Sequence, residues 1–139
     1  NEMNAETLEE ISYFMLEHKD EYADKRLILY GNIPGLAYYL DMAPAIDTTW
    51  ADLDTYSVSL FKEGLFGAAA LAGQESLRPL VILSPLLSAW ISGDQEVMEW
   101  WGIEQGQWEQ DEKLTALRSF MKEQTYRQVF ANEAFVVYD

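Results

Sequence analysis

The chain has 139 residues, of which 49% are hydrophobic and 24% charged, proportions that fit one globular domain and exclude a disordered segment. Its formal net charge of −15 repels polyanions, so nucleic acid and anionic lipid head groups are excluded as favoured partners. The sequence contains no cysteine, which excludes disulfides and thiolate metal sites.

In the first half of the chain, the apolar pattern predicts helices that alternate with short strands. Residues 5–22 are expected to form an amphipathic helix, because apolar side chains recur at steps of three and four. The apolar run 27–30 predicts a strand buried on both faces, and a Gly-Asn-Ile-Pro-Gly turn then leads into a short helix over 36–40. Residues 45–47 predict a second, brief strand. The helix expected over 58–72 is apolar nearly all round in its second half, which predicts burial on all sides.

The second half of the chain predicts a third strand, three helices and a hairpin. The strand lies between Pro79 and Pro85, and Asp94 is a natural N-cap for one of the helices. In chain order, the expected elements are the strand 80–83, the helices 86–91, 95–101 and 112–123, and hairpin strands over 127–131 and 135–138.

Together these elements predict a single α/β domain over residues 1–139. We expect a layered sandwich with helices on the faces of a mixed, mostly parallel sheet and an antiparallel hairpin at the C-terminal end. The strands 27–30 and 80–83 should be parallel neighbours or near-neighbours. The longest uncharged stretch, 79–93, is too short to span a bilayer. The sequence begins with Asn1 rather than Met, and we expect it to be a fragment of a larger membrane protein.

Two polar residues follow the predicted strands at positions where α/β sheets bind ligands. Asn32 comes directly after the first strand and Ser84 after the third, so the two would face one crevice if these strands are neighbours. The turn at Asn32 is not a dinucleotide-binding fingerprint, and its position favours a tight connection between strand and helix over a ligand site. Ser84 lacks the context of a nucleophile elbow, and its position favours the cap of a helix with Pro85 at its first position.

Three aspartates surround a tryptophan in the segment after the predicted second strand. Asp47, Asp52 and Asp54 could bind a hard cation such as calcium, although the spacing is not that of an EF-hand. Asp52 and Asp54 could instead cap the next helix. Beside Trp50, the same carboxylates resemble a sugar-binding arrangement, in which the aromatic face stacks on the ring.

No catalytic set is recognisable in the sequence. The single histidine, His18, lies on the apolar face of a predicted helix, where packing or capping is expected. Nothing selects a pair among the 24 acidic residues for glycoside hydrolysis. We therefore predict no catalytic residue, no metal ligand and no cofactor in this chain. The ligand contacts that we predict are Tyr30, Asn32, Asp47, Trp50 and Ser84.

Both ends of the chain resemble a known protein family. The run KRLILYGNIPGLAYYLDMAPAIDTTWADLDTY resembles a stretch in the soluble domain after the last membrane helix of bacterial polytopic glycosyltransferases, the lipid-phosphosugar-dependent enzymes of the oligosaccharyltransferase and protein mannosyltransferase type. The terminal YRQVFANEAFVVYD is similar to their closing hairpin. The residues that carry the resemblance are Tyr30, Gly31, Asn32, Pro34, Gly35, Tyr38, Trp50, Tyr126, Phe130 and Tyr138.

The resemblance implies a non-catalytic accessory domain on the extracytoplasmic face of the bacterial cell membrane. The catalytic carboxylates of that family lie in loops near the first membrane helices, and no such loop is present here. The implied partners are the membrane-embedded remainder of the same chain and a sugar or glycan acceptor. The alternative that the residues leave open is a free-standing, cytoplasmic α/β module that binds a small ligand between Asn32 and Ser84.

Overall fold

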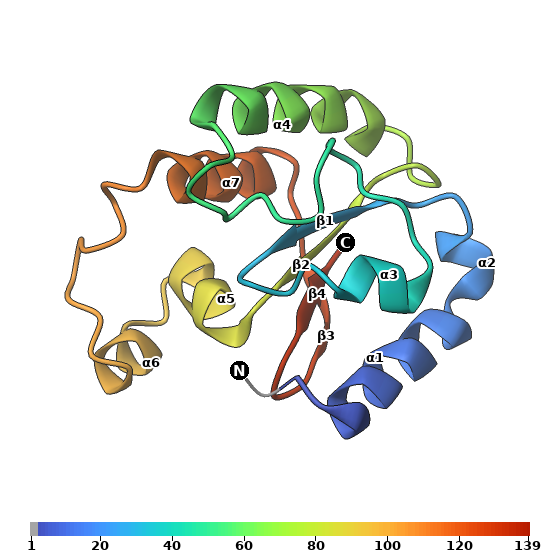
Figure 1. The fold of residues 1–139 in the computed structure, drawn as a ribbon, viewed down its shortest axis with the longest axis horizontal. Helices are drawn as coiled ribbons and strands as arrows, with labels where there is room; N and C mark the ends of the chain where they lie inside the picture. The colour runs from blue at the N-terminus through green and yellow to red at the C-terminus, as the bar shows by residue number, and fades with distance from the viewer. Residues whose placement is uncertain (1–2) are drawn as a thin grey trace.

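The computed structural model describes residues 3–139 as an α/β domain with one four-stranded sheet (Figure 1). The helices are α1 (Ala5–Glu17), α2 (Lys19–Tyr22), α3 (Leu36–Leu40), α4 (Val58–Ala72), α5 (Pro85–Ser92), α6 (Gln95–Trp100) and α7 (Glu112–Glu123). The strands are β1 (Leu27–Tyr30), β2 (Leu80–Leu83), β3 (Gln128–Ala131) and β4 (Val136–Tyr138). No helix among the described residues is long and apolar enough to cross a membrane.

The sheet has the strand order β1-β2-β4-β3. β1 and β2 are parallel neighbours, with Leu27 opposite Leu80 and Tyr30 opposite Leu83, which confirms the predicted pairing. β4 then pairs with β2 and with β3 in antiparallel fashion, so the C-terminal hairpin completes the sheet. The predicted α/β class with a mixed sheet is confirmed, although only one of its three strand pairings is parallel where we expected most to be.

Helices cover both faces of the sheet, and each face has its own apolar core. In β1, Ile28 and Tyr30 point into a core shared with α4, α5 and α7, whereas Leu27 and Leu29 point into a core shared with α1, α2 and α3. This division follows from the alternation of side chains along a strand. In Figure 1, α4 and α7 accordingly lie above the sheet, and α1 and α3 lie below it.

The helix predicted over residues 5–22 is interrupted at one residue. α1 ends before His18, whose φ of −107° and ψ of 18° leave the helical region, and α2 begins directly after it. The Nδ1 atom of His18 lies 2.9 Å from the Phe14 carbonyl oxygen, and its ring packs between Phe14 and Tyr22. His18 therefore has the packing and capping role that its position predicted.

The strand predicted over residues 45–47 does not form. The segment touches the sheet only through an isolated bridge between Leu27 and Pro44, in which the Leu27 amide donates to the Ala43 carbonyl and the Ala45 amide donates to the Leu27 carbonyl. Pro44 has no amide hydrogen to donate, so it cannot extend a ladder. The chain leaves the sheet edge directly afterwards.

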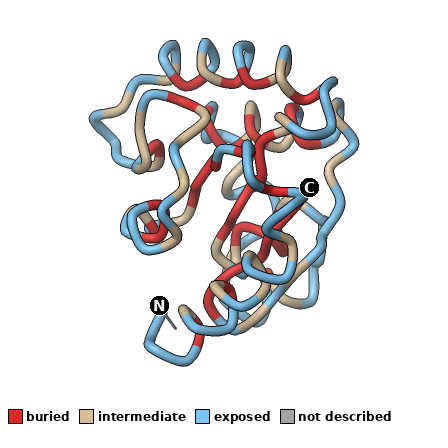
Figure 2. Tube along the Cα trace, turned by 90° about the vertical axis from the view of Figure 1, so that its right-hand side faces the viewer, coloured by how far each residue is buried: buried red, intermediate tan, exposed pale blue. Residues whose placement is uncertain are grey.

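The expectation that α4 is buried on all sides is wrong. Phe61, Leu65 and Ala68 face the core, whereas Phe66 is 83% exposed. Figure 2 shows α4 at the top, with its inner side buried and its outer side exposed. The run of glycines and alanines misled the prediction, because small residues are tolerated on either side of a helix and do not reveal which face is covered.

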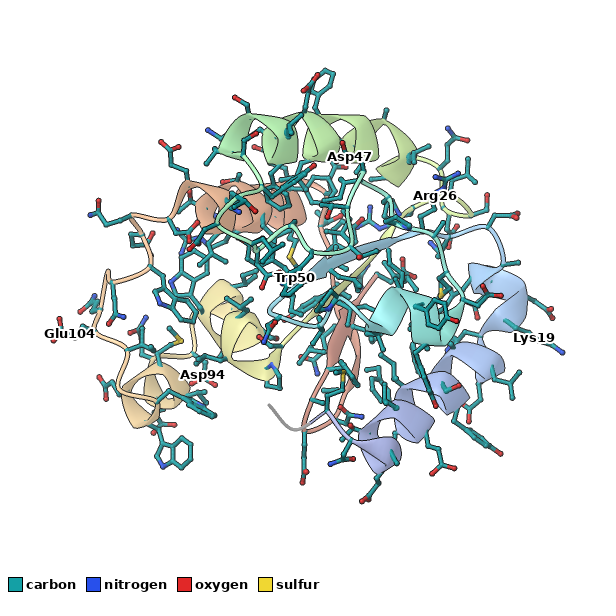
Figure 3. The ribbon with its side chains drawn as sticks, viewed as in Figure 1. Lys19, Arg26, Asp47, Trp50, Asp94 and Glu104 are labelled. Carbon is teal, nitrogen blue, oxygen red and sulfur yellow. The ribbon has the colours of Figure 1, made fainter. Side chains whose placement is uncertain are left out.

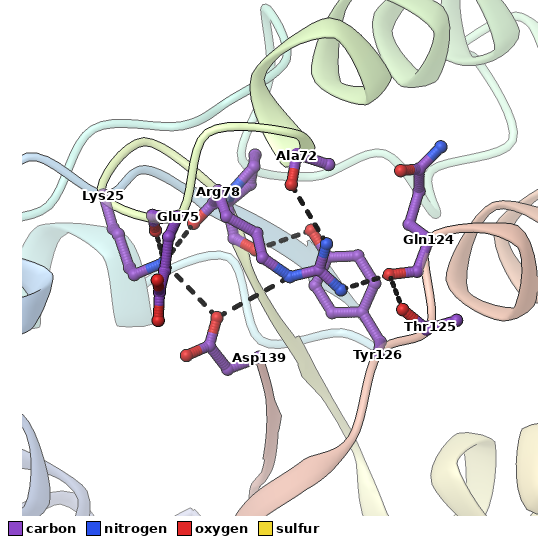
Figure 4. A network of polar contacts seen from close by, with 9 residues as sticks. Lys25, Ala72, Glu75, Arg78, Gln124, Thr125, Tyr126 and Asp139 are labelled. Carbon is purple, nitrogen blue, oxygen red and sulfur yellow. Dashed lines mark hydrogen bonds and ion pairs between the residues drawn. The ribbon is translucent and has the colours of Figure 1, made fainter.

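A polar network closes the opposite end of the sheet from the β1 and β2 carboxyl ends (Figure 4). The buried Lys25 donates from Nζ to the carbonyls of Glu75 and Arg78, at 2.6 and 2.9 Å, and to Asp139 Oδ1 at 3.3 Å. The Arg78 guanidinium lies 4.0 Å from the centre of the Tyr126 ring. The last residue of the chain is thereby tied to the segments that precede β1 and β2.

Candidate functional site

A pocket of about 300 Å³ lies at the carboxyl ends of β1 and β2. Three separate parts of the fold meet there: the turns after the two parallel strands, the end of α6 and the tip of the β3–β4 hairpin. Its lining consists of Gly31, Asn32, Ser84, Pro85, Leu86, Trp101, Glu133 and Ala134. Ligands of open α/β sheets bind at this edge, so the pocket is the candidate site that the topology favours.

The structure brings Asn32 and Ser84 into one pocket because the two turns lie very close together. A Cβ atom on Gly31 would lie 2.5 Å from Ser84 Oγ and 2.9 Å from the Ser84 backbone nitrogen. The Ser84 amide donates to the Tyr30 carbonyl at 3.3 Å, which joins the turns just beyond the strands. Only glycine at position 31 lets the two backbones approach this closely.

Asn32 is held in place by its backbone. Its φ of 61° is in the left-handed region, which asparagine tolerates better than most residues. Its amide donates to Asp52 Oδ2 at 2.7 Å. The backbone amide of Asn32 makes this contact, and its side-chain amide is not used in it. The side chain therefore keeps both its donor and its acceptor groups for a ligand in the pocket.

Ser84 is the N-cap of α5, with Pro85 in the first turn as predicted. Its hydroxyl makes no hydrogen bond to the first turn of α5, however. The capping explanation therefore accounts for the backbone position of Ser84 but leaves its hydroxyl free to meet a ligand in the pocket.

Trp101 and Glu133 complete the pocket, and neither was among the predicted ligand contacts. Trp101 follows α6 as its C-cap and is 56% exposed. Glu133 lies at the hairpin tip, where Asn132 Oδ1 accepts from the amides of Ala134 and Phe135, both at 2.9 Å. The sequence signal that could have indicated Glu133 is the predicted hairpin turn itself, which begins at the same asparagine.

Tyr30 is a core residue rather than a pocket residue. It is 4% exposed, and its ring lies 5.5 Å from that of Phe61 beneath α4. Burial raises the pKa of its phenol, and the carboxylates of Asp111 and Asp52 raise it further. The alternation along β1 places this side chain, with that of Ile28, on the face covered by α4, α5 and α7.

Asp47 and Trp50 also lie outside the pocket lining. Asp47 accepts a short hydrogen bond from the Tyr56 hydroxyl, and Trp50 is 38% exposed. In Figure 3, Asp47 lies just below α4, whereas Trp50 lies nearer the centre of the view. The five predicted contacts are therefore spread over four places, and only Asn32 and Ser84 share a pocket.

The loop that contains Asp52 is fixed by a buried lysine from α7. Lys113 donates from Nζ to the carbonyls of Ala51, Leu53 and Tyr56, at 2.7, 2.8 and 3.0 Å. These bonds hold the segment from which Asp52 reaches the Asn32 amide. Lys113 thus supports the pocket turn indirectly, through the loop.

Within residues 3–139, no group of three or more His, Asp or Glu side chains is arranged to hold a metal ion. Of the three aspartates considered for calcium, Asp52 accepts from Asn32 and Asp47 from Tyr56. Asp52 and Asp54 do not cap α4 either, since its N-cap is Ser57, whose Oγ accepts from the Leu60 amide at 3.1 Å.

Comparison of the chain with protein-family models, curated proteins and solved structures finds no match. The family resemblance of the sequence therefore stays a prediction, and the site has to be interpreted from its own geometry.

Proposed function

We propose that this domain binds a neutral, polyhydroxylated ligand, of the sugar class, in the pocket at the carboxyl ends of β1 and β2. The observation that carries the proposal is the set of groups in that pocket. An amide (Asn32), a hydroxyl (Ser84), a carboxylate (Glu133) and an indole ring (Trp101) line one small cavity.

Each of these groups suits a sugar. The amide and hydroxyl can both donate and accept, and the carboxylate accepts from sugar hydroxyls. An exposed indole offers an apolar face against which the C–H groups of a sugar ring can pack. The Glu133 carboxylate and the net charge of −15 disfavour an anionic ligand such as a free phosphate, despite the nearby N-terminus of α5.

From the resemblance of the sequence, we further propose that the domain is a non-catalytic, extracytoplasmic accessory part of a membrane-bound glycosyltransferase-like protein. The pocket would then hold part of a glycan acceptor while chemistry takes place in the membrane-embedded remainder of the chain. A free-standing binding module would use the same pocket in the same way, so the ligand proposal does not depend on the parent protein.

Binding can be tested by titrating the ¹⁵N-labelled chain with a panel of methyl glycosides and following backbone amide shifts. We expect saturable shifts at Gly31, Asn32 and Ser84 for at least one sugar. Trp101→Ala should weaken binding by about tenfold, the effect of losing ~1.4 kcal/mol of stacking. Trp50→Ala is the matched control, since Trp50 is partly exposed but lies outside the pocket.

Two results would contradict the proposal. One is the absence of saturable shifts around the pocket for every glycoside up to the solubility limit. The other is equal loss of binding in Trp101→Ala and Trp50→Ala, which would place the site elsewhere or show only general affinity for aromatic surface. Release of free sugar by the purified chain, abolished by a single substitution, would contradict the separate proposal that the domain is non-catalytic.

A further inference from the structure

A second hollow, at the C-terminal end of α5, has a lining unlike those of the other hollows of this acidic molecule. It measures about 680 Å³ and lies between α5 and α7, beside the end of β4. Two basic side chains, Arg118 and Lys122, line it together with four hydroxyl groups, and none of its lining residues is acidic. The sugar pocket and three further hollows, by contrast, each include at least one glutamate in their lining.

The two cations differ in what they can offer a ligand. Arg118 is paired with both carboxylate oxygens of Glu109, at 3.0 and 2.6 Å, and lies over the Trp90 ring at 4.0 Å. Its charge is therefore largely compensated. Lys122 is exposed, and it has no carboxylate partner among residues 3–139. One uncompensated positive charge thus remains at the hollow.

Three of the four hydroxyl groups that line the hollow already have hydrogen-bond partners within the protein. Tyr126 donates to the Pro79 carbonyl at 2.7 Å, and Ser92 donates to the Ala89 carbonyl at 3.1 Å. The hydroxyl groups of Tyr138 and Ser88 are hydrogen-bonded to each other. Ser119 lies three residues before Lys122 on α7, so the two side chains are neighbours on one helix face. Its hydroxyl and the Lys122 ammonium are the donors left for an incoming group.

The remaining lining of the hollow is apolar. Ile91 and Tyr126 are partly exposed there, whereas Met121 and Tyr138 are 3% and 7% exposed and form its floor. A ligand that fits this surface has an apolar or aromatic body and a single anionic group. A polyanion is disfavoured, because one free ammonium cannot offset its charge against the −15 of the chain.

We propose that the hollow between α5 and α7 is a second binding site, for an amphipathic monoanion such as an aromatic or aliphatic carboxylate or sulfonate. The anionic group lies against Lys122 and Ser119, and the apolar body lies against Ile91 and Tyr126, the partly exposed apolar residues of the lining. This site is independent of the sugar pocket, and either can exist without the other.

The probe for this site is 8-anilinonaphthalene-1-sulfonate, an aromatic sulfonate, added to the folded chain under conditions where circular dichroism confirms native structure. We expect one saturable site, with amide shifts confined to Ser92, Ser119 and Lys122 and their neighbours. Lys122→Glu should weaken binding by about tenfold, because it replaces the attraction of the anionic group by a repulsion. N-phenyl-1-naphthylamine, which lacks the sulfonate, should bind at least several-fold more weakly.

Two variants make the test specific. Lys19→Glu introduces the same charge change on an exposed lysine of α2, on the other face of the sheet, and should alter the affinity less than about twofold. Ser92→Trp fills the hollow from an exposed position and should abolish binding of both probes. Equal weakening by Lys122→Glu and Lys19→Glu, shifts centred on Gly31 and Ser84, or no saturation would each overturn the proposal.

Discussion

Two consecutive residues determine the shape of the sugar pocket. Gly31 has a φ of 114° and Asn32 a φ of 61°, and the chain reverses sharply between them at the end of β1. The first of these conformations is open in practice to glycine alone, and the second is tolerated by asparagine. The pocket exists because this turn lies directly against Ser84.

We predict that Gly31→Ala destabilises the domain by roughly 1–3 kcal/mol, because the new methyl group is strained at this φ and overlaps Ser84. Gly35→Ala is the matched control. Gly35 has a φ of −70°, and nothing lies within 4 Å of a Cβ atom built there. Urea unfolding monitored by circular dichroism measures both changes. Equal stability of the two variants would show that the turn can relax without cost.

At this scale, the sequence could locate only part of the candidate site. Asn32 and Ser84 follow apolar runs, and the rule that parallel strands present their carboxyl ends together was enough to pair them. Tyr30 could have been excluded because it belongs to a strand that was predicted to be buried on both faces. The predicted hairpin turn already pointed to Glu133, but its meeting with Trp101 could not be predicted, since that depends on how α6 and the hairpin pack.

The elements of the fold were predictable where the apolar pattern was unambiguous. β1, β2, α3, α4 and α7 have the predicted boundaries, because short apolar runs between turn residues and helical periodicity are strong local signals. The strand predicted at 45–47 does not form, because this segment meets the sheet through a single bridge, between Leu27 and Pro44, and then leaves the sheet edge. The prediction that α4 is buried on all sides was wrong, because alanine and glycine do not indicate which side of a helix is covered.

The two phenylalanines of α4 provide a direct test of its orientation. Phe61 is fully buried and Phe66 is 83% exposed. We predict that Phe61→Ala lowers the free energy of unfolding by ~3–5 kcal/mol, as for other buried aromatic side chains. Phe66→Ala should change it by less than about 0.5 kcal/mol, as for an ordinary surface substitution. Chemical denaturation of both variants measures the difference, and comparable losses would mean that α4 has a covered outer face.

At the scale of the whole molecule, the network around Lys25 joins segments far apart in the sequence. Lys25 precedes β1, Arg78 precedes β2, and Asp139 follows β4. The Asp139 carboxylate lies 3.3 Å from Lys25 Nζ and 3.8 Å from Arg78 Nε. Because the Lys25 side chain is only 3% exposed, the carboxylate compensates a charge that water cannot reach.

We predict that Asp139→Asn destabilises the domain by roughly 1–3 kcal/mol, since it leaves the Lys25 ammonium with carbonyl partners only. Lys25→Met, which retains the apolar stem, and the double variant complete a double-mutant cycle. Thermal unfolding of the four proteins gives the coupling energy. Additive effects of the two substitutions would show that the ion pair contributes nothing beyond its separate parts.

Buried phenols give the folded molecule a characteristic response to alkaline pH. Burial raises the pKa of Tyr22 to about 12, and the carboxylates of Asp139 and Glu21 contribute further. Partial burial and the hydrogen bond to Asp47 raise the pKa of Tyr56 to about 12, but this side chain keeps contact with solvent and contributes less than a buried phenol. The pKa values of Tyr30 and Tyr126 are raised as well, mainly by burial.

The sign of the effect follows from proton counting. An unfolded chain releases its phenolic protons near pH 10, whereas the folded chain retains these protons to about pH 12. Between those values the folded state binds more protons, so its stability falls as the pH rises, by ~1.4 kcal/mol per pH unit for each such proton. Below pH 10 this contribution to stability is fully present.

We therefore predict that the free energy of unfolding in urea decreases steeply between pH 10 and pH 12, and that Tyr22→Phe reduces the slope by about one proton, or ~1.4 kcal/mol per pH unit. Tyrosinate absorbance at 295 nm, recorded together with circular dichroism, supplies a second readout. Part of the absorbance change should coincide with loss of helical signal, because the buried phenols ionise only when the domain opens. A complete absorbance change in a chain that keeps its native circular dichroism would contradict the burial of these rings.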